Sequence, residues 1–145
     1  MDRMNVLSTR VLRDRGVLEV EDRGGDLVFV WRGVDPLGRM EDVREFVIPA
    51  GFLDHLAGML MDPTATDAAG RVTLNEPELS FVVGVKWEGE HRILEVRERG
   101  ENSRPYFRVR LSPLEARRIA GLCERSALAA HFVAVLSKTP AGGKR

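Results

Sequence analysis

Apolar and polar residues alternate along two segments of the chain, and a helical pattern follows each segment. In the first segment, three runs with strand character are separated by turn-forming residues. Alternation with a period of two residues predicts strands that bury one face. The spacing of the apolar residues then changes to that of a helix over residues 52–60, and Asp62-Pro63 ends this helix. The three strand runs cover residues 16–22, 27–32 and 44–48, with a turn at 23–26 and a loop at 33–42.

The second segment has the same order of patterns. Strand runs over residues 79–87, 92–98 and 105–111 are separated by turns at 88–90 and 100–103. Ser112-Pro113-Leu114-Glu115 follows, and it has the form of a capping box with proline at the first helical position. The sequence therefore predicts a helix that begins at this box, and the apolar residues from Ala127 to Leu136 continue or restart it.

Shared residues indicate that the two segments are repeats. Leu56-Ala57-Gly58-Met59 in the first predicted helix corresponds to Ile119-Ala120-Gly121-Leu122 in the second, and Arg32-Gly33 corresponds to Arg99-Gly100. Residues 6–12 and 71–74 are predicted to add one strand to each repeat. We therefore expect an α+β fold, a tandem repeat in which three to four antiparallel strands are followed by one helix. The predicted boundaries are 1–62 for the first repeat, 63–70 for a linker, 71–138 for the second repeat and 139–145 for a flexible tail.

The order of four strands, a helix, four strands and a helix resembles the Whirly and Pur-alpha fold. A single such unit, dimerised, is the fold of the positive-cofactor-four type coactivators. The stretch from Val20 to Val30, with its glycine turn, resembles the strand-turn-strand of these families. The resemblance spans residues 10–136 and rests on the order of the elements and the placement of turns, without a diagnostic motif. It implies a curved sheet that carries single-stranded DNA or RNA, with helices on the other face that hold the core or a dimer partner.

The two halves of the chain differ in net charge. The whole chain has 22 basic and 22 acidic residues and a net charge of zero, whereas the families named above are usually basic. Residues 1–75 carry nine basic and 13 acidic residues, and residues 76–145 carry 13 basic and nine acidic ones. The balances are −4 and +4, so the second half is the one to search for a polyanion-binding surface.

Alternation along the second repeat places a set of cations and one aromatic residue on the face opposite the predicted core. Such a set suits a single strand of nucleic acid, because cations contact phosphates and flat groups stack on bases. Two other interpretations stay open: a protein-binding face, or a solvated face whose cations pair with Glu95 and Glu98. The candidate nucleic-acid-binding residues are Lys86, Arg97, Arg99, Tyr106, Arg108 and Arg110, with Arg104 in the turn before the last strand.

The corresponding face of the first repeat is acidic or mixed, with Glu19, Glu21 and Glu45. We therefore expect at most one repeat to carry a nucleic-acid strand. As an alternative, the acidic half could mimic nucleic acid or dock a basic partner.

Residues that could support catalysis or bind a cofactor are sparse. His55, His91 and His131 lie far apart in the sequence, without the spacing of metal ligands. Cys123 lies on an apolar helical stripe and is expected to be buried, and Trp31 and Trp87 are expected to pack in the core or at its rim. We therefore expect no enzyme activity, no metal and no cofactor.

The preferred function is that of a single-stranded nucleic-acid-binding protein, with an accessory role in transcription or replication as a candidate. The alternative is a protein-binding adaptor or regulator, for example an inhibitor of a nucleic-acid-handling complex. The long apolar stretch after Ser126 predicts a homo-oligomer. The N-terminus lacks an apolar signal core, no apolar run is long enough to span a membrane, and the single cysteine suits a reducing compartment, so we expect a cytoplasmic protein.

Overall fold

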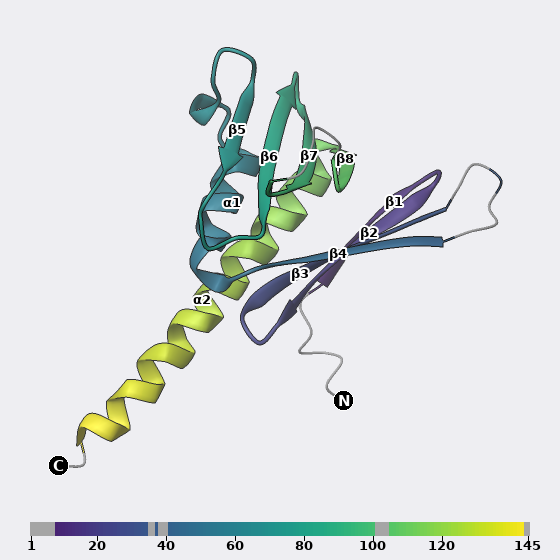
Figure 1. The fold of residues 1–145 in the computed structure, drawn as a ribbon. Coiled ribbons are helices and arrows are strands. Elements are labelled where there is room, and N and C mark those ends of the chain that lie inside the picture. Colours follow the sequence, from purple (N-terminus) through teal and green to yellow (C-terminus); the bar gives the residue numbers. More distant parts are fainter. Residues whose placement is uncertain (1–7, 35–36, 38–40, 101–104, 144–145) are drawn as a thin grey trace.

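Two four-stranded antiparallel sheets, each followed by a helix, make up the protein (Figure 1). The computed structural model describes residues 8–34, 37, 41–100 and 105–143. The predicted α+β class is confirmed, and so are the additional first strand of each repeat and the helix that begins at the capping box. The first sheet contains β1 (Ser8–Arg13), β2 (Gly16–Arg23), β3 (Asp26–Val34) and β4 (Glu41–Ile48), followed by η2 (Ala50–Phe52) and α1 (Leu53–Met61). After η3 (Pro63–Ala65), the second sheet contains β5 (Arg71–Leu74), β6 (Phe81–Glu88), β7 (His91–Glu98) and β8 (Phe107–Leu111), followed by α2 (Pro113–Gly143).

Both sheets are meanders in which each strand pairs with the next one along the chain. Short turns make this order possible, and the turn between β2 and β3 requires glycine. Gly24 and Gly25 have φ angles of 67° and 97°, which are in the left-handed region. The backbone N–H of Gly25 also donates to the Asp22 carboxylate at 2.9 Å. This hairpin therefore sets the register of the first sheet.

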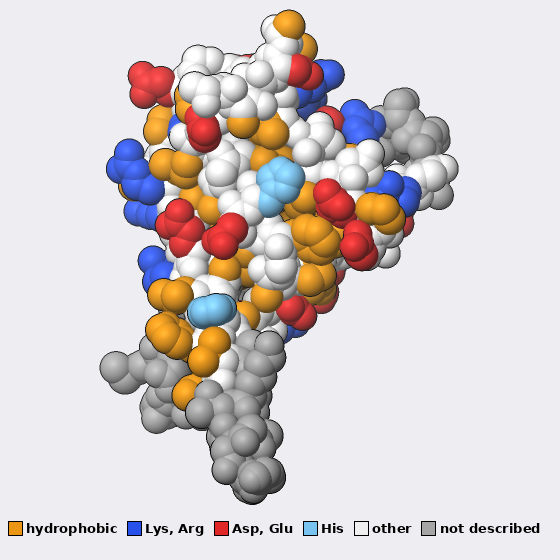
Figure 2. Space-filling view, turned by 90° about the vertical axis from the view of Figure 1, so that its left-hand side faces the viewer, with side chains coloured by type: hydrophobic (Ala, Val, Ile, Leu, Met, Phe, Trp, Pro, Cys, Tyr) orange, Lys and Arg blue, Asp and Glu red, His pale blue; other side chains and the backbone are white. Residues whose placement is uncertain are grey.

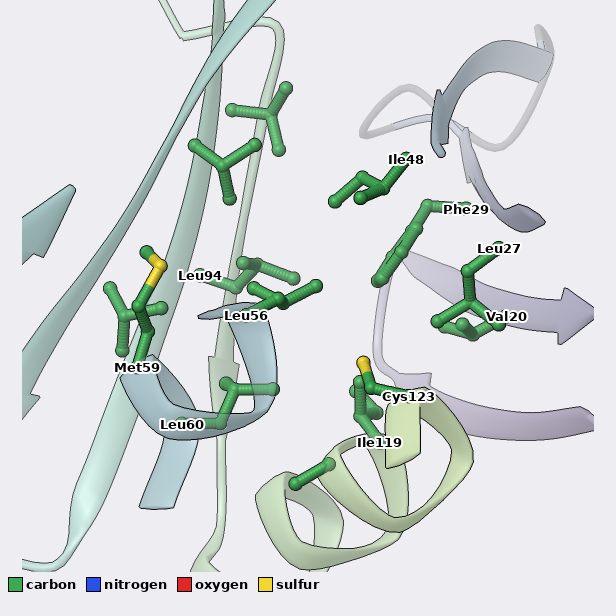
Figure 3. Packing of buried hydrophobic residues seen from close by; sticks show 14 of the residues in the cluster. Val20, Leu27, Phe29, Ile48, Leu56, Met59, Leu60, Leu94, Ile119 and Cys123 are labelled. Atoms are coloured by element: carbon green, nitrogen blue, oxygen red, sulfur yellow. The ribbon is translucent and has the colours of Figure 1, made fainter. Parts of the chain in front are cut away.

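The inner faces of the two sheets share one core with both helices (Figure 3). Phe29 and Ile48 come from the first sheet and Leu94 from the second, and Leu56 of α1 lies between them. Ile119 of α2 also reaches this core, and its side chain is fully buried. The two repeats therefore do not fold around separate cores, because the inner face of each sheet is covered in part by elements of the other half.

The beginning of α2 is fixed by the predicted capping box. The backbone N–H of Glu115 donates to Ser112 Oγ at 3.1 Å, and the N–H of Ser112 donates to Glu115 Oε1 at 2.9 Å. Glu115 also accepts from the guanidinium of Arg13 in β1, at 3.0 Å from Nη1 to Oε2. Arg13 donates further to the backbone carbonyl of Arg110 in β8. One ion pair therefore connects the first sheet to both the second sheet and α2.

The second half of α2 leaves the body of the protein (Figure 1). The apolar stretch after Ser126 continues the same helix, which runs without a break to Gly143. The helix includes residues 139–143, which the sequence assigns to a tail. Extending an existing helix requires no new nucleation. At the end of the predicted linker, the Asp67 carboxylate accepts from the backbone N–H groups of Ala69 and Arg71. Among the described helices, none has the length and apolar character needed to cross a membrane.

The first prediction concerns the charge of Glu115. The hydrogen bond from Arg13 is the largest cause that lowers the pKa of Glu115 below its usual range. A carboxylate with a lowered pKa stabilises the fold above its unfolded pKa, near about 4.3, and this contribution is lost as the pH falls through the folded pKa. Glu115→Gln keeps an acceptor for the cap but removes the charge. We expect it to lower the free energy of unfolding by about 1–2 kcal/mol at pH 7, and the difference from wild type to fade below about pH 4.

Urea unfolding at pH 7 and at pH 3 measures this difference. Glu124→Gln, at an exposed position of the same helix, is the matched control and should change stability by less than about 0.5 kcal/mol. An equal loss at both pH values would show that the charge of Glu115 does not stabilise the fold.

The second prediction compares two glycines. A Cβ at Gly16 would lie 2.4 Å from Trp31 Cζ2 and 2.8 Å from the carbonyl oxygen of Arg32, whereas a Cβ at Gly58 in α1 would meet no atom within 4 Å. Gly16→Ala should therefore destabilise the protein by about 1–3 kcal/mol. Gly58→Ala should stabilise it by about 0.5–1 kcal/mol, because alanine restricts the unfolded chain and favours helix. Thermal unfolding of the two variants should show shifts of opposite sign.

Candidate nucleic-acid interface

The register of the second sheet brings side chains from all four strands together on its outer face. Thr73, Gly84, Glu95 and Arg108 form one row across the sheet, since each is paired with the next. A neighbouring row contains Arg71, Lys86, Ile93 and Arg110. Because side chains alternate along a strand, these residues point away from the core.

A depression of about 220 Å³ lies on this face, and we call it the sheet-2 hollow. Its floor is apolar or lacks a side chain: Val82, Gly84 and Ile93. A Cβ at Gly84 would have no heavy atom closer than 3.9 Å, so the space above this glycine is open. Val85 also contributes to the lining, and the other lining residues are polar or charged: Arg71, Lys86, Arg97 and Arg108 together with Thr73 and Glu95.

Two carboxylates are shared among four of the cations on this face. Glu95 Oε1 lies 3.1 Å from Arg97 Nη2, and Glu95 Oε2 lies 3.8 Å from Arg108 Nε. Glu88 pairs with Lys86 at 3.6 Å and with Arg110 at 3.1 Å. The expected pairing with glutamate is therefore present, although the second partner is Glu88 and not Glu98. With Arg71 added, five cations face two carboxylates, a balance of +3.

Lys86, Arg97, Arg108 and Arg110 thus lie together, as the alternation predicts. Arg71 is a further cation of this face, beyond the residues predicted from the sequence. It pairs with Lys86 across β5 and β6, and among the described residues it forms no ion pair with a carboxylate. The signal was present in the alternation of residues 71–74, but the short strand gave no register with which to place Arg71 beside Lys86.

Tyr106 does not share this face, so its predicted placement is wrong. Its ring packs against Phe81 with centroids 4.8 Å apart, and its hydroxyl donates to the carbonyl of Glu45 and accepts from the N–H of Glu45, both at 3.2 Å. The guanidinium of Arg44 lies over the ring, 5.3 Å from its centroid. The alternation fails here because β8 begins only at Phe107. Tyr106 instead joins the edge strand β4 of the first sheet to the second sheet.

Arg99 also lies away from the hollow. It follows the end of β7, and its guanidinium donates to the carbonyls of Leu79 and Glu76 and to Asn75 Oδ1, at 3.0, 2.6 and 2.7 Å. These hydrogen bonds hold the loop between β5 and β6, so the position of Arg99 has a structural explanation. Arg104 lies outside the described residues.

The outer face of the first sheet is mixed in charge, in agreement with its sequence. Glu19 accepts from Arg10 and Arg32, and the hydrogen bond from Arg32 is the largest cause that lowers the pKa of Glu19. Val28 and Val30 lie between these charged residues and are buried although they face outward. Arg32 also pairs with Glu41, so two cations meet two carboxylates and this face lacks the positive charge of the sheet-2 hollow.

The single cysteine and the two tryptophans have structural surroundings. Burial raises the pKa of the Cys123 thiol to about 12, so the reactive thiolate is scarce at neutral pH. The indole N–H of Trp87 donates to the carbonyl of Met59 at 3.1 Å, and Trp31 packs against the core. No group of three His, Cys, Asp or Glu residues that could hold a metal ion occurs within the described part of the chain. That the protein is not an enzyme stays a prediction.

Comparison with known proteins links the chain to others through its fold. No protein-family model and no curated protein matches the sequence. Among solved structures, the Trypanosoma brucei MRP1/MRP2 structure is similar, with a TM-score of 0.59, 10% identity and coverage of 92% of this chain and 88% of that chain. The structure of a guide-RNA-binding protein complex bound to a guide RNA is also similar, with a TM-score of 0.58, 12% identity and coverage of 90% and 94%. At these identities the likeness concerns the fold, and the chain has the same overall fold as these two proteins.

Proposed function

We propose that the protein binds single-stranded nucleic acid across the sheet-2 hollow. The observation that carries this proposal is the hollow itself: a floor with open space above Gly84, surrounded by Arg71, Lys86, Arg97 and Arg108. Cations at the rim can contact successive phosphates of a strand, while the floor can accept one unstacked base. A double helix would not present an unstacked base to such a depression.

The glutamates do not prevent this binding. The side chains that pair on this face are 29% to 55% exposed, and exposed ion pairs contribute only about 0–1 kcal/mol each. A phosphate that approaches the rim can therefore replace a carboxylate at small cost. Release of counterions from the strand adds a favourable contribution that weakens as the salt concentration rises.

Bases would be held without an aromatic residue from this face, because Tyr106 packs between the sheets. The planar guanidinium groups of Arg97 and Arg108 can stack on bases instead. This arrangement favours binding with little sequence preference, since every base offers a flat surface.

The structural likeness supports the choice of ligand. One of the similar structures is a guide-RNA-binding protein complex bound to a guide RNA, so RNA is a ligand of a complex that contains a protein with this fold. The proposal includes both RNA and single-stranded DNA. An accessory role in transcription or replication on DNA would require the protein to bind single-stranded DNA. Binding is therefore measured with both an RNA strand and a DNA strand.

The third prediction is that neutralising the hollow weakens binding. Arg97→Gln with Arg108→Gln should reduce the affinity for oligo-U and oligo-dT about ten- to hundredfold, because two charge-assisted contacts to phosphate are lost. The slope of log affinity against log salt should fall by about 1.4, at about 0.7 for each lost contact to a single strand. Fluorescence anisotropy at several salt concentrations measures both quantities.

Arg23→Gln with Arg32→Gln is the matched control, because it removes the same charge from exposed positions of the first sheet. It should leave binding unchanged. Gly84→Val fills the hollow without changing charge and should weaken binding while keeping the salt slope. Absence of binding by the wild-type protein at low salt would contradict the proposed function.

We also propose that a second copy of the chain binds to the protruding part of α2. Leu128, Phe132 and Leu136 are 55%, 56% and 66% exposed, and Val135 is 43% exposed. Figure 2 shows apolar side chains gathered beside the grey end of the molecule. The spacing 128–132–135 alternates four and three residues, which is the pattern by which one helix packs against another helix of the same kind.

The fourth prediction follows from this stripe. The wild-type protein should sediment as a dimer or a higher oligomer at micromolar concentration, because pairing buries the exposed apolar side chains. Leu128→Ser with Phe132→Ser should sediment as a monomer. Leu12→Ser removes an equally exposed apolar side chain from the first sheet and should leave the assembly intact. A monomeric wild-type protein would rule out the homo-oligomer.

A further inference from the structure

A second basic depression lies between β1 and α2, away from the sheet-2 hollow. It has a volume of about 520 Å³, and four arginines line it: Arg10 from β1, and Arg117, Arg118 and Arg125 from α2. Ser8 and Thr9 of β1 also line it. We call this depression the arginine groove, and none of its residues lines the sheet-2 hollow.

Helix geometry places the arginines of α2 on one side. Residues three and four positions apart lie on the same face, so Gly121 lies between Arg117 and Arg118 on one turn and Arg125 on the next. A Cβ at Gly121 would lie 3.4 Å from Arg125 Nη1. The guanidinium of Arg125 therefore lies over position 121 of the helix.

Glycine in a helix costs up to about 1 kcal/mol relative to alanine. The equivalent glycine of the first repeat, Gly58, has no neighbouring side chain that a Cβ would meet, so the two glycines differ in their surroundings. At Gly121 the heavy atom that a Cβ would approach belongs to Arg125, and both residues line the arginine groove.

Few carboxylates pair with the arginines of the groove. Within the described part of the chain, Arg117, Arg118 and Arg125 form no ion pair. Only Arg10 has a carboxylate partner, Glu19, and it shares this partner with Arg32. In the sheet-2 hollow, by contrast, three of the four lining cations have a carboxylate partner.

The charge of Arg117 also acts on a group inside the protein. The pKa of Arg92, whose side chain is buried, is lowered first by burial and second by the positive charge of Arg117. Bringing four guanidinium groups together when only Arg10 has a carboxylate partner is unfavourable for the free protein, and an anion in the groove relieves the repulsion.

We propose that the arginine groove is a second site for the phosphate backbone of nucleic acid. Guanidinium and hydroxyl groups are the donors that proteins use for phosphate oxygens. An acidic protein segment fits less well, because such a partner gains most of its affinity from apolar anchors, and the apolar residue of the groove, Leu122, is only 1% exposed. The groove contacts the backbone and reads no bases.

The inference goes beyond the proposed function, and it rests on that function only for the choice of nucleic acid among polyanions. With two sites on one protein, a strand long enough to contact both gains affinity through effective concentration, whereas a short strand does not. The two sites therefore make binding depend on strand length.

The fifth prediction tests the groove with the full-length protein and two probes, an 8-mer and a 40-mer of uridylate. Arg118→Gln with Arg125→Gln should weaken binding of the 40-mer about tenfold or more and lower its salt slope by about 1.4. Arg15→Gln with Arg23→Gln removes the same charge from exposed positions outside the groove and should have no effect. Combined with Arg97→Gln and Arg108→Gln, the groove variant should lose the remaining affinity for the 40-mer.

The outcomes separate the two proposals. If the groove variant weakens 40-mer binding while the variant of the sheet-2 hollow does not, the groove is supported and the proposed site on the second sheet is wrong. If the groove variant binds the 40-mer with wild-type affinity and salt slope, the inference is overturned, whatever the hollow variant does. Loss of poly-glutamate binding with unchanged 40-mer binding would likewise overturn it and indicate an acidic protein partner.

Discussion

The first turns of α2 are the constraint on which the rest of the structure depends. They lie between the two sheets, and Ile119 and Cys123 are fully buried there. The capping box fixes where the helix begins, and the Arg13–Glu115 pair joins that beginning to the first sheet. Because both sheets direct their inner faces at the same helix, neither half can complete its core alone. The repeat seen in the sequence is therefore a repeat of local structure within one folding unit.

Packing both sheets against the same helices leaves two outer sheet faces open to solvent, and these faces have different chemistry. On the first sheet, two arginines, Arg10 and Arg32, pair with two glutamates, Glu19 and Glu41. On the second sheet, the cations outnumber their shared glutamates and surround the open floor at Gly84. The zero net charge of the chain thus arises from surfaces that differ, and a polyanion would meet the local charge and not the sum.

The equivalent glycines of the repeat show how one sequence motif acquires different roles. Gly58 and Gly121 both follow an alanine inside a helix, and both alanines are buried. Gly58 faces open space, whereas Gly121 lies beneath Arg125 in the arginine groove. The difference comes from position in the fold. The short helix α1 lies among core elements, whereas the arginines of α2 lie beside β1. A motif that marks a repeat therefore does not by itself mark a site.

The sequence by itself determined the strands, both helices and the capping box. It also determined which side of the second sheet carries Lys86, Arg97, Arg108 and Arg110. These features depend on local periodicity and on residues close in the chain. Only the tertiary structure decided the places of Tyr106 and Arg99, which bind Glu45 and the loop at residues 75–79. It also decided that Arg71 joins the hollow and that Arg10 meets the arginines of α2. Such groupings depend on strand register and on packing between elements far apart in sequence, and the alternation of apolar and polar residues along one segment contains no information about either.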